Sequence, residues 1–282
     1  MCCLSNLKLA NMNIHYFRYP FSYFLEKQDE QGCKSIVFWG SVPHLWVDQL
    51  GCEDTANTAE MLDGLRIKVE AYAARPYNYS LFAPKGSLQR KCTESYYRHC
   101  INAAQMLGTN RICIDLWGAL RDIDAEVQYE NCAEMLKELC EYAKESDCTI
   151  IVGNVPFANS AMMNTLSEVK RLWGDVHTDN CGISLDICTA MENGEDIKAW
   201  QDTFGDRLTM VYLADGDGAG AGYPLGSGCY PIAEILNILE ERKYRGMVAI
   251  KMDREKNELD PVGADRVNFE YLKKAINAKF AI

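Results

Sequence analysis

The sequence is poor in histidine and in cationic residues and has no long apolar run, and each scarcity excludes a class of protein. Four histidines are too few for a site that binds three metal ions. The 40 acidic residues outnumber the 29 lysines and arginines, which leaves a net charge of −11. No basic run offsets this charge, so no nucleic-acid partner is expected. No apolar run reaches the roughly 18 residues that cross a bilayer, so no membrane association is expected.

Cysteine, by contrast, is abundant, with 13 residues. The cysteines form no CxxC pair and no spacing typical of a zinc site, and they fall within segments expected to be helices and strands. We therefore predict reduced, mostly buried thiols, as in a reducing compartment. The first nine residues lack the basic and apolar regions of a signal peptide, which favours a cytoplasmic location.

Short apolar runs alternate with longer amphipathic segments along the whole chain. Eight runs are expected to be strands buried on both faces, at 7–13, 35–40, 67–73, 111–117, 149–154, 182–187, 208–215 and 247–252. Apolar residues recur at helical spacing between them, most clearly over 87–107, 122–145 and 232–242. Eight alternating strand–helix units predict a single α/β domain over residues 1–282, a (β/α)₈ TIM barrel.

A glycine-rich stretch lies in an unusual place. No glycine follows the first predicted strand, which argues against a dinucleotide-binding sheet, and six glycines instead lie between Gly216 and Gly228, after the seventh strand. This stretch is interpreted either as a flexible loop over the mouth of the barrel or as a cradle whose backbone N–H groups bind a phosphate or a sugar. Both interpretations stay open.

The carboxyl ends of the predicted strands are expected to line the site, because a (β/α)₈ barrel places its reactive groups there. They carry His15, Trp39 and His44, Glu70, Asp115 and Trp117, Asn154, Asp186, Asp215 and Asp217, and Lys251 and Asp253. Carboxylates that accept O–H groups and aromatic rings that pack against C–H faces suit a small carbohydrate ligand. Any single carboxylate could instead cap a helix or pair with a neighbouring cation.

Four parts of the sequence carry a resemblance to a known family. They are SIVFWGSVPHL (35–45), RPYNYS (75–80), ISLDICTAMENGE (183–195), and YLADG (212–216) with the later Gly226-Ser-Gly228 and Tyr244-Arg-Gly246. In these the chain resembles the sugar phosphate isomerase/epimerase family with its xylose isomerase-like barrel. Within that family it most resembles the fructoselysine and ketose 3-epimerases and the large subunits of C-glycoside deglycosidases. The resemblance covers nearly the whole chain.

The resemblance also implies a divalent cation, commonly manganese, held by Glu, Asp, His and Glu at the ends of strands five to eight. Here the four positions are Gly153 (or Val152 in a shifted register), Asp186, Tyr212 and Lys251. One carboxylate beside an ammonium cannot hold a hard divalent ion. No metal and no other cofactor is therefore expected, and the two glutamates that the family uses as acid and base are missing as well.

Lys251 suggests a specific hypothesis, in which its ammonium occupies roughly the place of the missing cation with Asp186 as its main partner. In one alternative Lys251 points to solvent at the rim. In another it forms a Schiff base, although a neighbouring carboxylate raises the pKa of a lysine and so disfavours the neutral amine. The candidates for proton transfer in that case are Asp115, Asp186, Glu70 and Tyr212.

Two functions follow. In the first, the barrel binds a sugar or a sugar derivative at its mouth and is catalytically weak or silent, acting alone, as a homo-oligomer or paired with an active paralogue. In the second, it is an active isomerase or epimerase that moves a proton next to a carbonyl at an altered or metal-free site. The predicted catalytic residues are Asp186, Lys251 and Tyr212. The predicted substrate-binding residues are Trp39, His44, Glu70, Asp115, Trp117, Asn154 and Asp215.

Overall fold

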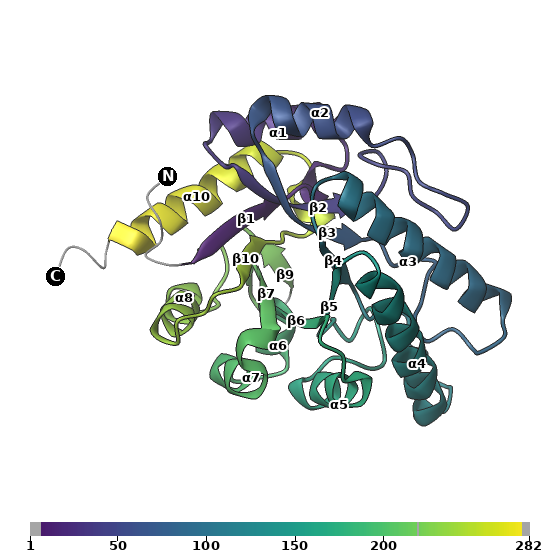
Figure 1. Cartoon of the computed structure of the whole chain (residues 1–282). Helices are drawn as coiled ribbons and strands as arrows, with labels where there is room; N and C mark the ends of the chain where they lie inside the picture. The colour runs from purple at the N-terminus through teal and green to yellow at the C-terminus, as the bar shows by residue number, and fades with distance from the viewer. Residues whose placement is uncertain (1–6, 219, 278–282) are drawn as a thin grey trace.

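The computed structural model describes residues 7–218 and 220–277, which form a closed barrel of eight parallel strands surrounded by helices (Figure 1). The order around the barrel is β1-β2-β3-β4-β5-β6-β7-β10, and β10 pairs with β1 to close it. The strands are β1 (Lys8–Met12), β2 (Ser35–Gly40), β3 (Lys68–Ala74), β4 (Arg111–Ile114), β5 (Thr149–Gly153), β6 (Cys181–Asp186), β7 (Leu208–Leu213) and β10 (Met247–Ile250). The predicted (β/α)₈ barrel is confirmed, and each strand overlaps its predicted range.

Helices pack around the outside of the barrel (Figure 1). They are α1 (Phe21–Glu30), α2 (Ala56–Leu65), α3 (Leu88–Met106), α4 (Ala125–Lys144), α5 (Leu166–Val176), α6 (Ile187–Glu192), α7 (Ile197–Phe204), α8 (Ile232–Glu241), α9 (Arg254–Asn257) and α10 (Pro261–Asn277). The three clearest predicted helices correspond to α3, α4 and α8. Within the described ranges, no helix combines the length and apolar character that a membrane span requires.

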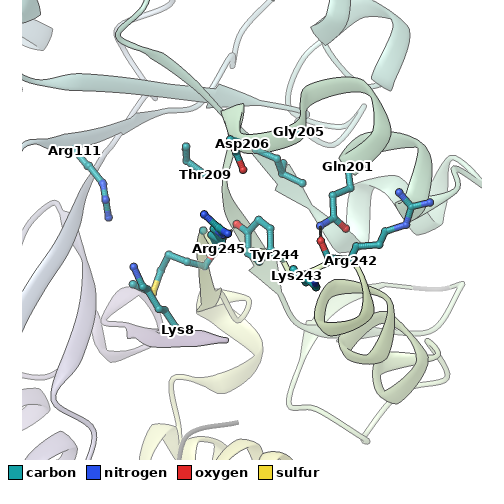
Figure 2. Close-up of a pocket in the computed structure, with 13 residues that line it drawn as sticks. Lys8, Arg111, Gln201, Gly205, Asp206, Thr209, Arg242, Lys243, Tyr244 and Arg245 are labelled. Atoms are coloured by element: carbon teal, nitrogen blue, oxygen red, sulfur yellow. Dashed lines mark hydrogen bonds between the residues drawn. The ribbon is translucent and has the colours of Figure 1, made fainter. Parts of the chain in front are cut away.

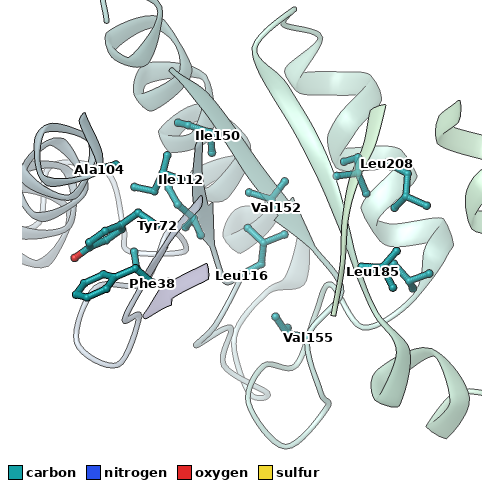
Figure 3. Close-up of a cluster of buried hydrophobic side chains, with 14 of the residues drawn as sticks. Phe38, Tyr72, Ala104, Ile112, Leu116, Ile150, Val152, Val155, Leu185 and Leu208 are labelled. Atoms are coloured by element: carbon teal, nitrogen blue, oxygen red, sulfur yellow. The ribbon is translucent and has the colours of Figure 1, made fainter. Parts of the chain in front are cut away.

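Apolar side chains pack in two layers because successive residues of a strand point to opposite faces. Phe38 and Val152 belong to the layer between strands and helices (Figure 3), whereas their neighbours Val37 and Ile151 belong to the layer inside the barrel. All four are at most 1% exposed. A parallel strand buried on both faces therefore has a continuous run of apolar residues, which is why these strands could be predicted from the sequence. The cysteines of the described residues are free thiols, most of them buried, as predicted.

The last helix is held to the start of the chain by the buried Asp265 of α10. Its carboxylate accepts hydrogen bonds from Asn11 Nδ2 (2.9 Å), His15 Nε2 (3.0 Å), Tyr16 Oη (2.7 Å) and Gln28 Nε2 (2.8 Å). Figure 1 shows α10 in yellow beside β1 and α1 in purple. His15, which we expected at the mouth of the barrel, is fully buried in this cluster and has a structural role.

Candidate functional site

A cavity of about 240 Å³ opens at the carboxyl end of the barrel. Its charged lining residues are Asp115, Asp186, Lys251, Asp253 and Arg254, and its aromatic lining residues are Trp39, Tyr77 and Trp117. Five of the ten predicted site residues therefore meet here, namely Trp39, Asp115, Trp117, Asp186 and Lys251. They lie at or just beyond the carboxyl ends of β2, β4, β6 and β10, since parallel strands bring these ends to one face.

Lys251 and Asp186 form an ion pair in this cavity. The distance from Lys251 Nζ to Asp186 Oδ2 is 3.2 Å, and Nζ also lies 4.5 Å from the centroid of the Tyr212 ring. The side chains of Lys251 and Asp186 are 25% and 12% exposed. The predicted pairing is thus present, and the alternative in which Lys251 points to solvent is wrong. The ammonium is held by a carboxylate and by the face of an aromatic ring.

The charge state of Lys251 follows from its surroundings. Burial alone would lower its pKa, but the carboxylates of Asp115 and Asp186 outweigh burial and raise the pKa above the ordinary value. Lys251 therefore carries its proton at neutral pH. A Schiff base forms from the neutral amine, so this environment disfavours that chemistry.

Asn154 holds Asp186 in place. The backbone N–H of Asp186 donates to Asn154 Oδ1 (2.7 Å), and Asn154 Nδ2 donates to the Asp186 carbonyl (3.1 Å). Asp186 Oδ1 accepts from the backbone N–H of Thr189 (3.1 Å) and so caps α6. Asn154 is buried outside the cavity lining, so its position contradicts the predicted substrate contact and gives it a positioning role instead.

Asp115 and the aromatic residues form the part of the cavity that is open to a ligand. None of the residues 7–218 and 220–277 donates a hydrogen bond to the Asp115 carboxylate, so its oxygens are available as acceptors. The rings of Tyr77 and Trp117 meet edge to face with centroids 5.7 Å apart. Trp39 is fixed through its backbone N–H, which donates to Asn13 Oδ1 (2.6 Å).

Tyr212 lies in the apolar layer inside the barrel and is only 4% exposed. Burial raises the pKa of its phenol well above the ordinary value, with the nearby Cys113 and Asp115 acting in the same direction. A neutral, buried phenol is poorly suited to the catalytic role that we predicted. Its observed contact with Lys251 is through the face of its ring.

The predicted position of Glu70 at the mouth is wrong. Glu70 is the third residue of β3, which continues to Ala74, so Glu70 lies in the amino-terminal half of the strand. Its carboxylate accepts from Lys68 Nζ (3.0 Å) and Ser35 Oγ (3.4 Å), away from the cavity. A carboxylate within a strand was mistaken for one at its end.

His44 also lies outside the cavity, contrary to the predicted substrate contact. It is 6% exposed, with Nδ1 2.7 Å from Asn13 Nδ2 and Nε2 3.0 Å from the Tyr19 carbonyl. The amide nitrogen of Asn13 can only donate and the Tyr19 carbonyl can only accept, so the proton lies on Nε2 of a neutral ring. Burial lowers the pKa of His44, which favours the same state. Both ring nitrogens are used within the protein.

Asp215 holds the glycine-rich stretch together instead of contacting the cavity. Asp215 is 1% exposed. Its carboxylate accepts hydrogen bonds from the backbone N–H groups of Gly216 (2.8 Å), Gly226 (2.9 Å), Gly228 (3.0 Å) and Tyr230 (3.0 Å). These N–H groups are therefore not free to cradle a phosphate, and Asp215 lies outside the cavity lining. The stretch includes a hairpin of β8 (Asp215–Gly216) and β9 (Ala221–Tyr223), whose Ala221 and Gly222 line the cavity.

The four positions at which the resemblance implies metal ligands are Gly153, Asp186, Tyr212 and Lys251. A Cβ on Gly153 would overlap the carbonyl oxygen of Ser184, so no side chain can reach the site from this position. Tyr212 presents a buried phenol and Lys251 an ammonium. The described part of the chain contains no group of three or more His, Cys, Asp or Glu side chains placed to hold a metal ion.

Arg254 and Cys188 are among the cavity residues that sequence reasoning missed. The Arg254 guanidinium lies 4.5 Å from the centroid of the Phe17 ring and donates to Glu255 Oε1 (2.9 Å). Burial raises the pKa of the Cys188 thiol to about 12, so the thiol is neutral. Each lies a few residues beyond the end of a barrel strand, and a wider window after each strand would have included both.

Comparisons with known proteins agree with this architecture. Residues 27–275 match the family described as the xylose isomerase-like TIM barrel. The chain belongs to this family. A curated relative, fructoselysine 3-epimerase of Shigella flexneri, is 22% identical over 250 residues, which cover 87% of this chain and 90% of the relative. The predicted membership of the sugar isomerase/epimerase family is thereby confirmed.

Solved structures show the same fold. D-psicose 3-epimerase from Clostridium cellulolyticum, solved with D-tagatose, superposes with a TM-score of 0.79 at 17% identity over 96% of this chain and 99% of its own. The IOLI protein, solved with a bound zinc atom, superposes with a TM-score of 0.80 at 16% identity. The match covers 98% of this chain and 100% of the IOLI chain. At these identities the likeness concerns the fold alone.

Proposed function

We propose that this family member binds a sugar or a sugar derivative at the carboxyl end of its barrel without a divalent metal, and that its catalysis is weak or silent. The observation that supports this most is the Lys251–Asp186 ion pair beside Tyr212. In this proposal the protonated amine takes the place of the cation that the family resemblance implies. The Asp186 carboxylate, already paired with this ammonium, needs no metal cation to balance its charge.

The remaining groups of the cavity favour a hydroxyl-rich ligand. The Asp115 carboxylate has acceptor sites available for O–H groups, and the ammonium of Lys251 can donate to a carbonyl or hydroxyl oxygen. Trp39, Tyr77 and Trp117 offer ring surfaces for the C–H faces of a sugar. A volume of about 240 Å³ is suited to a single sugar ring or an open-chain ketose.

Titration calorimetry tests the proposal with D-fructose, D-psicose, D-tagatose and fructoselysine, each with EDTA or with added Mn²⁺. We expect at least one ligand to bind with the same affinity in both conditions, and elemental analysis to find no stoichiometric metal. Asp115→Asn should weaken binding, whereas Glu70→Gln, which changes a carboxylate outside the cavity, should not. Stoichiometric manganese, cobalt or zinc, or binding that needs Mn²⁺, would overturn the proposal.

A second candidate is an active, metal-free isomerase or epimerase. It is favoured by the presence of an available carboxylate, Asp115, and a protonated Lys251 in one cavity, since a base and a cation can together move a proton next to a carbonyl. Exchange of a ketose C–H in D₂O, followed by proton NMR with EDTA present, separates the two candidates. Exchange that Lys251→Met abolishes supports the second, and no exchange supports the first.

A further inference from the structure

A second pocket lies at the opposite, amino-terminal end of the barrel. Its volume is about 510 Å³, and its lining includes Lys8, Arg111, Lys243 and Arg245 (Figure 2). Lys8 and Arg111 are the first residues of β1 and β4, and Lys243 and Arg245 belong to the turn between α8 and β10. These three segments are far apart in the sequence, and barrel closure brings them together because parallel strands begin at the same face.

The pocket concentrates positive charge in a chain whose net charge is −11. Arg242 adds a fifth cation to the lining, and among the described lining residues the only carboxylate is that of Asp206. Arg242 is bonded to Asp202, with Nη2 3.1 Å from Oδ2. Within the described ranges the other four cations have no hydrogen-bond or ion-pair partner on their side chains. Among the described residues, no carboxylate is therefore bonded directly to these four side chains.

The turn that carries two of these cations is rigidly built. Tyr244 is 4% exposed and its hydroxyl donates to the Met247 carbonyl (3.1 Å). Gly246 is required beside it, because a Cβ there would overlap the Tyr244 hydroxyl. The buried Tyr244 fixes the turn, whereas the side chains of Lys243 and Arg245 on either side are exposed at the pocket. The cations are thus presented on a fixed backbone.

We propose that this pocket is a binding site for a small polyanion that carries two or more phosphate groups. Guanidinium groups bind phosphate through paired N–H donors, and lysine ammonium groups add point charges. Cations on three separate segments favour a ligand whose charges are also spread over several groups. The volume is within the usual range for small-molecule sites, and the concave shape favours a compact ligand over a nucleic-acid duplex.

The site is independent of the proposed function, because it lies at the other end of the barrel and shares no residue with the cavity at the mouth. A ligand that binds the folded chain here raises the melting temperature by mass action. Because its attraction is largely electrostatic, the affinity falls as salt concentration rises.

Calorimetry and thermal unfolding with tripolyphosphate as the probe test the proposal on the full chain. We expect saturable one-site binding that raises the melting temperature and weakens as KCl rises from about 50 to about 200 mM. The double variant Lys8→Gln/Arg245→Gln should bind at least about tenfold more weakly, as expected when two charged contacts are lost. Orthophosphate should bind more weakly than tripolyphosphate.

The matched control is Lys91→Gln/Arg266→Gln, which removes one lysine and one arginine from exposed helical positions outside the pocket. It changes the net charge by the same amount and should keep the affinity of the unmodified chain. Equal weakening in both double variants would show a response to net charge only and would overturn the proposal. Absence of saturable binding to the unmodified chain would also overturn it. Unfolding curves without the probe establish that each variant folds.

Discussion

At the scale of single residues, Lys251 determines the electrostatics of the cavity. It is the cation bonded to Asp186, and the Asp115 carboxylate shares the same cavity. We predict that Lys251→Met lowers the free energy of unfolding by about 1 to 3 kcal/mol, because two carboxylates lose a partly buried counter-charge. Urea unfolding measures the change. Lys251→Arg, which keeps the charge, should recover part of the loss.

The pH dependence of this difference tests the charge state of Lys251. The folded-state pKa is raised above that of the unfolded chain, so its stabilising contribution is fully present below the ordinary lysine value of about 10.4 and is lost only as pH rises through the raised pKa. The stability difference between the unmodified chain and Lys251→Met should therefore stay constant from about pH 7 to about pH 9. A difference that grows over this interval would indicate a depressed pKa and would contradict this assignment.

Residue roles were harder to predict than residue positions. Asp215 and Asn154 do follow strands as predicted, yet they bond to backbone groups of the protein. Strand position indicates that a side chain is near the mouth, but the partner that takes its hydrogen bonds is set by loop paths. Those paths depend on long-range packing, such as the approach of Gly226 to Asp215, that the sequence pattern does not specify.

At the scale of secondary-structure elements, the close contact of β5 with β6 accounts for the glycine at position 153. We predict that Gly153→Ala lowers the free energy of unfolding by about 3 kcal/mol or more, because the added Cβ must displace the Ser184 carbonyl and with it a strand. Gly174→Ala is the control, since its Cβ would enter open space on α5, and it should be neutral or stabilising by up to about 1 kcal/mol. Thermal unfolding compares the two variants. Equal stabilities would show that β6 shifts to accommodate the added Cβ at little cost in free energy and would contradict the prediction.

At the scale of the whole molecule, the alternation of buried strands and amphipathic helices was sufficient to predict the barrel, because parallel strands buried on both faces are continuously apolar. The positive pocket at the amino end could not be found in the same way. Its cations come from three separate parts of the sequence, at Lys8, at Arg111 and at 242–245, and meet only when β1, β4 and the turn before β10 come together. Local pattern thus predicts elements, whereas clusters of charge depend on how the barrel closes.

Closure of the barrel depends on Asp265 as well as on the pairing of β1 with β10. The Asp265 carboxylate is 1% exposed and accepts four hydrogen bonds. An asparagine in its place would point its NH₂ group, which can only donate, at side chains that also donate. We predict that Asp265→Asn lowers the free energy of unfolding by about 2 to 4 kcal/mol. Hydrogen exchange should accelerate in α10 and β1 before β5, because the seam between the ends of the chain opens first. Glu270→Gln, an exposed change on the same helix, should leave exchange unchanged, and uniform acceleration across all strands in Asp265→Asn would contradict a local seam.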